Sequence, residues 1–304
     1  MIVAIAGRRE ATARILLDAA LGDADHEFTD DFGAADAVVL LEPADVADVR
    51  ESAVVVAYAD DAATAASADG IAATVVTFGL SATADVRADA IESTVDRTAF
   101  TLHSGDSSAP VSVGILGESV VPLVLAALAV AAATGKPTAE SIAALAPVTD
   151  SAPHDMRVTH PFDGVTLIDD TLDLTPRATA DALKALAQFT TDGTRSVAVL
   201  GALDLPAATD PIESRDEHDR IGRLVVRLNV SRLIVVGQSA RHIHNAAGLE
   251  GSWDGESVLV DTLDQAYDLL NDTEFSPRDA APLVLLVKSA GLTALINQPR
   301  RATT

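Results

Sequence analysis

Short, continuous apolar runs separated by stretches of helical character are the feature that most restricts the fold of this chain. In the first part of the sequence these runs are Ile2–Ala6, Ala37–Leu41, Ala53–Ala57 and Ala73–Phe78. A strand covered on both faces gives such a run, because neither face alternates with solvent. Residues 12–21 and 60–72 lie between these runs and are predicted to be helices. The alternation favours an α/β chain with parallel strands.

The residue types change after the last of these runs. Asp85 to Val113 is rich in β-branched residues and turn signals, which predicts antiparallel strands with a loop at 104–108. Ser119 is expected to cap an Ala-rich helix that ends at Gly135. Thr138 is expected to cap a second, shorter helix that stops at Pro147.

Residues 148–160 show no periodicity and mark the predicted boundary between domains 1–147 and 148–304. Beyond it the alternation of strand and helix restarts, which predicts a small doubly wound parallel sheet. The predicted strands are Val165–Asp169, Ser196–Leu200, Arg232–Val236, Ser257–Val260 and Leu283–Lys288. The predicted helices are Pro176–Phe189, Glu217–Leu228, Ala240–Ala247 and Thr262–Leu270, the first of them capped by Thr175.

Composition narrows the class of protein. A length of 304 residues suits two domains, and with 48% hydrophobic but 3% aromatic residues their cores must be aliphatic. The absence of cysteine excludes disulfides and thiolate metal sites. A formal charge of −24 argues against binding to nucleic acid or to anionic membrane surfaces.

The sequence predicts a cytoplasmic protein without a membrane-inserted segment. The first apolar stretch is very short and is followed by Arg8 and Arg9, which is not the order of an export signal. The longest apolar run, 120–133, contains Pro122 and falls short of the ~20 residues that span a bilayer.

The turn after the first predicted strand has the outline of a phosphate-binding loop. Such a loop uses glycines to face backbone N–H groups toward phosphate, a lysine to neutralise charge and a hydroxyl to hold a metal. Here Gly7 and Thr12 are retained, while Glu10 and Ala11 stand where a glycine and the lysine are needed. The alternative is an ordinary strand–turn–helix junction in which Gly7 only permits the turn.

Polar residues at the carboxyl ends of the later strands form a second candidate site. Open α/β sheets bind ligands at that edge, which favours Asp169, Asp170 and Asp173 as crevice residues. The alternative is that they cap the next helix and remain solvated. Lys288 ends another strand and is expected either to reach the crevice near Asp169 or to form a structural ion pair. His242 and His244 are two apart in a helix, so no metal site is predicted.

Several segments, in the same order, resemble the Mur ligases, and in particular the D-alanyl-D-alanine-adding members. The segments that carry the resemblance are Val3–Gly7, Val56–Asp61, Val75–Gly79, Ala84–Ala88, Gly117, Gly164–Thr171, Val199–Gly201, His218–Arg223 and Val287–Lys288. The resemblance implies a shortened P-loop-type central domain followed by a Rossmann-like C-terminal domain. It also implies that Thr175 and His218 belong to the crevice of Asp169, although a histidine on a helix surface is the alternative for His218.

The departures from the family lie at the positions that bind phosphate, metal and adenine in that family. The Gly-Lys-Thr of the family reads Glu10-Ala11-Thr12, and the interval from Thr12 to Tyr58 is too short for its metal-binding Glu and His and its carbamoylated Lys. Glu42 either imitates that Glu or is an exposed carboxylate at a strand end. The adenine contacts expected after Gly117 are missing, and a Gly-Arg pair at the domain junction reads His154-Asp155.

Further departures occur in the last domain. The family's Ser-Tyr-Asn-Ala-Asn-Pro loop reads 171–176 as Thr-Leu-Asp-Leu-Thr-Pro, Ala202 replaces an Asp, and the loop after Lys288 lacks an Arg. The family's N-terminal UDP-holding domain has no counterpart among these segments.

Together these changes predict a Mur-ligase-like protein that has kept the fold and lost ATP-driven ligation, with neither ATP nor Mg²⁺ expected to bind. Such a protein is expected to act as a scaffold or regulator of peptidoglycan precursor synthesis through protein contacts. Two alternatives stay open: a ligase on UDP-N-acetylmuramoyl peptides completed by a partner chain, and a binder of D-Ala-D-Ala or another small ligand.

Overall fold

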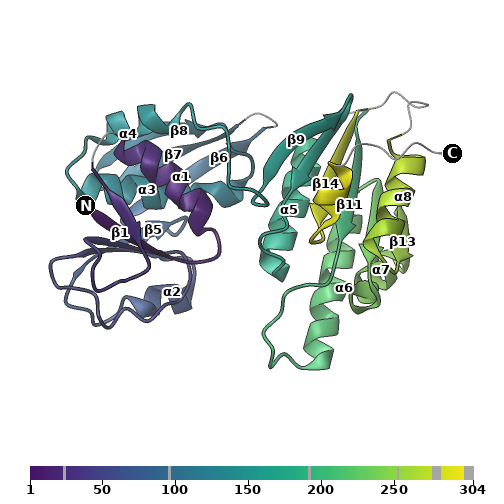
Figure 1. Cartoon of the computed structure of the whole chain (residues 1–304), viewed down its shortest axis with the longest axis horizontal. Helices are drawn as coiled ribbons and strands as arrows, with labels where there is room; N and C mark the ends of the chain where they lie inside the picture. The colour runs from purple at the N-terminus through teal and green to yellow at the C-terminus, as the bar shows by residue number, and fades with distance from the viewer. Residues whose placement is uncertain (23–24, 95–96, 191–192, 252, 276–281, 298–304) are drawn as a thin grey trace. The chain divides into compact units, whose positions relative to one another are not determined.

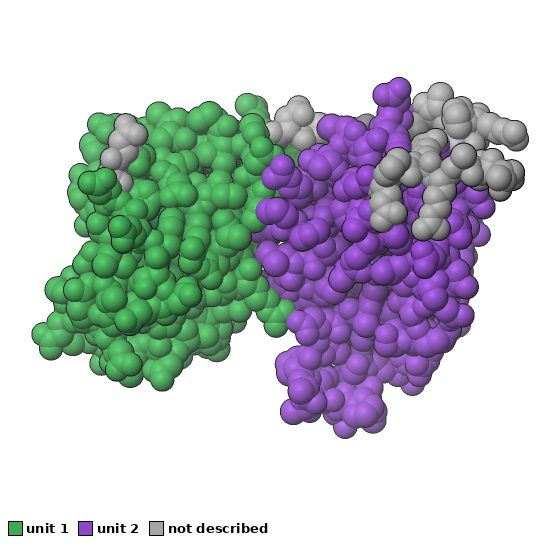
Figure 2. All heavy atoms as spheres, in the orientation of Figure 1, with its two compact units in different colours: residues 1–152 green, residues 153–304 purple. Residues whose placement is uncertain are grey.

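The chain divides into two compact units, residues 1–152 and 153–304 (Figures 1 and 2). The computed structural model describes all residues except 23–24, 95–96, 191–192, 252, 276–281 and 298–304. Among the described residues, no helix combines the length and the apolar character needed to cross a bilayer.

Unit 1 contains an eight-stranded sheet in the order β2-β1-β3-β4-β5-β6-β7-β8. Its strands are β1 (Ile2–Ala6), β2 (Glu27–Thr29), β3 (Ala37–Leu40), β4 (Val54–Tyr58), β5 (Thr74–Gly79), β6 (Val86–Ser93), β7 (Thr98–Ser104) and β8 (Ser107–Val113). Pairing is parallel from β2 to β6 and antiparallel among β6, β7 and β8. The sheet therefore joins a parallel half to an antiparallel meander. The antiparallel part was predicted from the β-branched residues and turn signals of residues 85–113.

Helices cover one face of this sheet, where the larger part of the core lies. They are α1 (Glu10–Leu21), α3 (Val121–Ala133) and α4 (Thr138–Leu145), which group together in Figure 1. Leu16 and Leu125 from the helices pack in one buried cluster with Val56, Phe78 and Phe100 from the strands. The opposite face of the parallel strands is covered by α2 (Ala62–Ser67) and loops, through a smaller cluster. Helix α3 is buried nearly all round, which explains its uniformly apolar sequence.

Unit 2 contains a six-stranded sheet in the order β13-β12-β11-β14-β10-β9. The strands are β9 (Arg157–Phe162), β10 (Val165–Asp169), β11 (Arg195–Leu200), β12 (Arg232–Val236), β13 (Glu256–Val260) and β14 (Leu283–Lys288). The helices are α5 (Pro176–Phe189), α6 (Pro211–Arg227), α7 (Arg241–Gly248), α8 (Leu263–Thr273) and α9 (Leu292–Ile296). All neighbouring strands are parallel except β9, which pairs antiparallel with β10.

Several sequence-based boundaries were wrong for identifiable reasons. Ser119 does not cap α3, because residues 118–120 form a 3₁₀ turn and the cap position is Val120, which makes no side-chain bond. Thr138 is the first helical residue of α4, preceded by Pro137. Strand β9 lies partly in the segment that showed no periodicity, since its residues are half-buried and follow no clear alternation.

The crossing of α6 and α7 depends on Gly222. A Cβ at this position would lie 2.3 Å from the carbonyl oxygen of Ile243 and 2.9 Å from Cβ of Ala246. Contacts this short do not occur between real side chains and backbone, so the two helices approach each other at a distance that only glycine permits.

Candidate functional site

The turn between β1 and α1 is shaped by the neighbouring strand. Gly7 has φ of +140°, and a Cβ there would lie 2.8 Å from Cβ of Leu41. The chain just after β3 is held against this turn, because the backbone N–H of Leu41 donates to the carbonyl oxygen of Ala6 at 2.9 Å. Glycine is therefore required here by backbone conformation and by the close approach of Leu41.

A backbone N–H group of this turn donates a hydrogen bond to a carboxylate of the chain itself. The N–H of Arg8 donates to Oε1 of Glu42 at 3.2 Å. Glu10, the first residue of α1, forms an ion pair with Arg14 one turn later. Negative side chains thus lie at the helix N-terminus, where they interact favourably with the helix dipole. In a phosphate-binding turn, the backbone N–H groups at this helix N-terminus would donate to the phosphate.

The hydroxyl of Thr12 is engaged inside unit 1. Thr12 is fully buried, and its Oγ1 accepts a hydrogen bond from the backbone N–H of Ala152 at 3.0 Å. Ala152 is itself buried and is the last residue of the unit. Thr12 therefore ties the final segment of unit 1 to its first helix across 140 positions of sequence.

Thr12→Val is expected to destabilise unit 1 by about 1–3 kcal/mol, because valine keeps the volume but leaves the N–H of Ala152 without this acceptor. Thr12→Ser, which retains the oxygen, is the matched control and is expected to cost less. Thermal unfolding followed by circular dichroism measures both. Equal stability of Thr12→Val and the unaltered chain would contradict the structural role.

The two aspartates after β4, Asp60 and Asp61, also accept hydrogen bonds from backbone N–H groups. Asp60 accepts from the N–H groups of Leu80 and Ser81 at 2.6 and 2.8 Å, and Asp61 accepts from the N–H of Thr64 as the cap of α2. The contacts of Asp60 position the turn that follows β5, whereas the contact of Asp61 lies at the start of α2.

In unit 2, the carboxylates at the end of β10 are buried and paired. Asp169 lies 2.7 Å from Nδ1 of His154 and accepts from the hydroxyl of Thr171 at 2.9 Å. Asp170 accepts from the N–H of Met156 at 3.1 Å and from Nζ of Lys288 at 2.7 Å. Asp169 and Asp170 are 4% and 6% exposed, so the expectation that they remain solvated was wrong.

Lys288 is the central cation of this cluster. It is 1% exposed, and besides Asp170 it donates to the backbone carbonyl of Asp173. Its carboxylate partner is Asp170, so the structural ion pair, one of the two alternatives for Lys288, is confirmed. The β10–α5 loop is fixed further by the N–H of Thr175, which donates to Oδ1 of Asp173 at 2.9 Å. Thr175 caps α5 as predicted, accepting from the N–H of Ala178.

His218 is buried and makes its own contacts. It is 4% exposed, which contradicts a histidine on the helix surface. Its Nδ1 lies 2.7 Å from the carbonyl oxygen of Ser214, and its Nε2 accepts from the N–H of Leu203 at 3.3 Å. Because Nδ1 must donate and Nε2 must accept, the neutral imidazole satisfies both contacts. His218 thereby holds the segment after β11, and within the described residues none of its hydrogen bonds reaches the Asp170–Lys288 pair.

His154 and Asp155, which stand in place of the family's Gly-Arg pair, also belong to this region of unit 2. His154 has φ of +68° and contacts Asp169, while Asp155 is only 2% exposed. Asp155 stands where the resemblance implies an arginine, and its side chain is buried. The contact between His154 and Asp169 depends on the unpredicted pairing of β9 with β10.

Among the described residues, no group of three or more His, Asp or Glu side chains is arranged to hold a metal ion.

Comparison with known proteins gives the family. Residues 32–131 match the Mur ligase middle domain. The UDP-N-acetylmuramoyl-tripeptide–D-alanyl-D-alanine ligase of Mycobacterium leprae is 40% identical over 215 residues, covering 66% of this chain and 40% of the relative. The enzyme of that name from Mycobacterium tuberculosis is 39% identical over 230 residues, covering 70% and 44%. The chain thus spans less than half the length of these curated relatives.

Solved structures show the same fold. MurF from Acinetobacter baumannii superposes with a TM-score of 0.74 at 18% identity, covering 98% of this chain and 77% of that one. MurF ligase from Thermotoga maritima in complex with ADP superposes with a TM-score of 0.70 at 16% identity, covering 98% and 78%. The middle-domain match, the 40% identity and the shared fold agree, and the chain belongs to the Mur ligase family.

Proposed function

We propose that this chain is a Mur-ligase-like protein of peptidoglycan precursor synthesis that does not itself use ATP to form an amide bond. In this proposal it acts as a scaffold or regulator through contacts with other proteins of that synthesis. The cell-wall context is supported by relatives named as UDP-N-acetylmuramoyl-tripeptide–D-alanyl-D-alanine ligases.

The chemistry of the β1–α1 turn supports the loss of ligation. Activating a carboxylate with ATP requires cations and preorganised donors around the phosphate being transferred, because neutralising its charge is most of the catalysis. The turn offers carboxylates instead: Glu42 accepts from its backbone, and Glu10 begins its helix. Ala11 stands where the lysine of a phosphate-binding loop is needed.

The observation that carries the proposal is the engagement of Thr12. A hydroxyl that is to hold a metal ion beside phosphate must face the ligand. The Thr12 side chain is fully buried and accepts from the backbone N–H of Ala152. The donor set of this turn supports the proposal that neither ATP nor Mg²⁺ binds here.

Isothermal titration with Mg-ATP tests the proposal. We expect no heat of binding with ATP up to the millimolar range, with the Thermotoga maritima MurF, which was crystallised with ADP, as the positive control. A parallel assay measures phosphate release with a UDP-N-acetylmuramoyl tripeptide and D-Ala-D-Ala. Tight ATP binding, or ATP-dependent amide formation by the chain alone or with an added partner, would refute the loss of ligation. A thermal shift with D-Ala-D-Ala alone would favour a ligand binder over a scaffold.

A further inference from the structure

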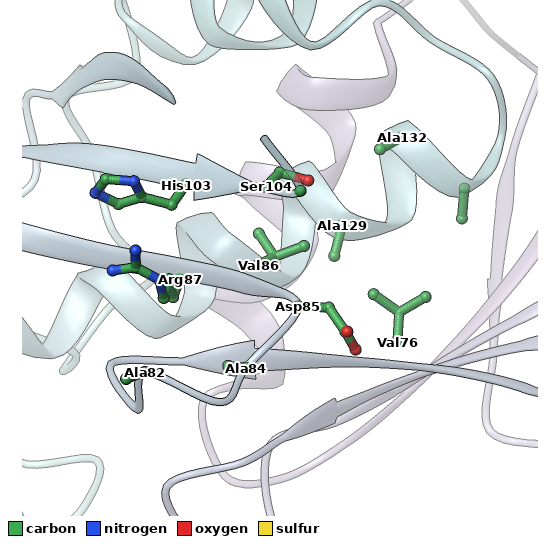
Figure 3. Close-up of a pocket in the computed structure, with 12 residues that line it drawn as sticks. Val76, Ala82, Ala84, Asp85, Val86, Arg87, His103, Ser104, Ala129 and Ala132 are labelled. Atoms are coloured by element: carbon green, nitrogen blue, oxygen red, sulfur yellow. The ribbon is translucent and has the colours of Figure 1, made fainter. Parts of the chain in front are cut away.

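A cavity of about 410 Å³ opens in unit 1 between helix α3 and strands β5 to β7 (Figure 3). Alanines of α3 and Val86 of β6 form an aliphatic wall. Arg87 and His103 are paired across β6 and β7 on the face of the sheet opposite to Val86, and both contact the carboxylate of Asp89. The cationic side chains nearest the cavity therefore lie on the far face of the sheet and are already engaged.

The outer edge of the unit 2 sheet is formed by β13, which pairs on one side only, with β12 (Figure 1). In a parallel ladder, alternate residues direct both their N–H and C=O groups to the neighbouring strand. The N–H of Glu256 donates to the residue before β12 at 3.3 Å, and the carbonyl oxygen of Val260 accepts from the residue after β12 at 2.8 Å. Glu256, Val258 and Val260 therefore face β12, while the backbone groups of Ser257 and Leu259 point away from the sheet.

This edge is open to another strand. Among the described residues, the outward N–H and C=O groups of Ser257 and Leu259 have no hydrogen-bond partner. Edges that stay unpaired are blocked by bulges, proline or very short length. Strand β13 keeps its register over five residues and contains no proline. An extended segment of another protein can therefore bind here by main-chain hydrogen bonds.

The side chains of β13 leave apolar surface beside this edge. Ser257 and Leu259 lie on the side of α7, where Oγ of Ser257 is 2.7 Å from Nδ1 of His244. Val258 and Val260 alternate with them and lie on the side of α8, where Val260 packs against the core. Both valines and Leu259 are only half-buried. An added strand would cover the rest of these side chains with its own.

The flank of α8 beside this edge is acidic. Glu274 at the end of α8 binds Arg195 of β11, so its flank of the helix faces the inner strands. Helical spacing places Asp268 and Asp272, one turn apart, on the other flank. Both are exposed, and neither forms an ion pair with a described residue. Leu269, next to Asp268, is half-buried against the core. The edge therefore offers apolar surface first and uncompensated negative charge beyond it.

We propose that the free edge of β13 binds an extended segment of a partner protein in which lysine or arginine alternates with apolar residues. The backbone of the segment bonds the outward groups of Ser257 and Leu259. Its cationic side chains lie on the side of α8, where their aliphatic stems cover Val258 and their charges meet Asp268 and Asp272. A second copy of this chain would bring two acidic flanks together, which disfavours it as the occupant. The assignment rests on the proposed function for its protein partner and on β13 and α8 for its geometry.

Peptides test the proposal by fluorescence anisotropy on the whole chain. The probe is a short labelled peptide that alternates lysine and valine. N-methylation of its valines removes one alternate set of N–H groups, and N-methylation of its lysines removes the other. Only one set faces β13, so one methylated peptide should bind about tenfold more weakly than the parent and the other as tightly as the parent. Equal affinity of all three peptides, or no binding of the parent, would overturn the strand pairing. Equal binding of a glutamate–valine peptide would overturn the charge assignment.

Variants locate the binding. Leu259→Pro removes an outward N–H and keeps the bonds to β12, and Leu259→Ala, which retains that N–H, is its matched control. The proline variant should bind the parent peptide about tenfold more weakly than the alanine variant. Asp268→Asn with Asp272→Asn should weaken binding by about tenfold at low salt, whereas Asp69→Asn with Asp106→Asn removes the same charge from exposed positions of unit 1 and should not. Circular dichroism verifies folding. Equal affinity of the folded Leu259 variants, or equal loss in both double variants, would overturn the proposal.

Sedimentation of the chain alone separates the two occupants of the edge. We expect no dimer that depends on β13. A dimer that Leu259→Pro dissociates would assign the edge to a second copy and overturn the proposal. Neither β13 nor α8 belongs to the β1–α1 turn, so failure of the peptide to bind refutes this surface alone, and the ATP titration tests the proposed function separately.

Discussion

Gly222→Ala is expected to destabilise unit 2 by about 1–3 kcal/mol, the usual cost of overpacking a well-packed contact. The added methyl group would meet the carbonyl oxygen of Ile243 at 2.3 Å, so α6 and α7 must separate. Alanine is intrinsically the better helix former by roughly 1 kcal/mol, and this preference opposes the effect. A net loss of stability would therefore show that helix packing outweighs propensity at this position.

Urea unfolding followed by tryptophan fluorescence measures this loss. Trp253 is the only tryptophan of the chain and lies in unit 2, where its Nε1 donates to the carbonyl oxygen of Val230 at 3.0 Å. Gly248→Ala, in the last turn of α7, is the matched control, since a Cβ there meets nothing within 4 Å. That variant should be neutral or slightly more stable. Equal midpoints for the two variants would contradict the packing argument.

Lys288→Met is expected to cost unit 2 about 3–5 kcal/mol, the usual effect of removing one partner of a buried ion pair. Methionine has a similar length and fills the space, but it removes the ammonium group that pairs with the buried carboxylate of Asp170. It also removes the donor to the carbonyl oxygen of Asp173. The cost comes from the uncompensated charge, since the pair itself stabilises the fold by little.

A double variant that also changes Asp170 gives the decisive comparison. The double variant Lys288→Met, Asp170→Asn buries no net charge, so it should recover a large part of the lost stability in the same urea experiment. Lys184→Met removes a lysine that pairs with Asp181 on the surface of α5 and should change stability by less than about 0.5 kcal/mol. A double variant no more stable than Lys288→Met would show that lost packing, rather than charge, is responsible.

The strands of the fold could be predicted from sequence where burial on both faces leaves a continuous apolar run. Ile2–Ala6, Val165–Asp169, Arg232–Val236 and Leu283–Lys288 were predicted with the bounds that the structure has. Half-buried edge strands such as β2 and β9 give no such run, so they were missed. The start of α6 was predicted six residues late, because its first turns are polar and exposed and carry no periodic signal.

The candidate sites were less predictable than the fold, because their properties depend on contacts distant in sequence. That Lys288 and Asp170 are strand-end residues could be read from the pattern, but which carboxylate meets the lysine is set by the packing of β14 beside β10. The burial of Thr12 depends on Ala152, and that of His218 on Leu203 and Ser214.

The position of β14 within its sheet has a consequence for synthesis on the ribosome. Among the described strands of unit 2 this one comes last in the sequence, yet it lies between β11 and β10. A nascent chain that has not released residues 283–288 holds β9 and β10 apart from β11, β12 and β13, with the apolar edges of both pieces unpaired. The sheet of unit 2 therefore cannot close until residues 283–288 have emerged, and the ion pair between Lys288 and Asp170 forms only then.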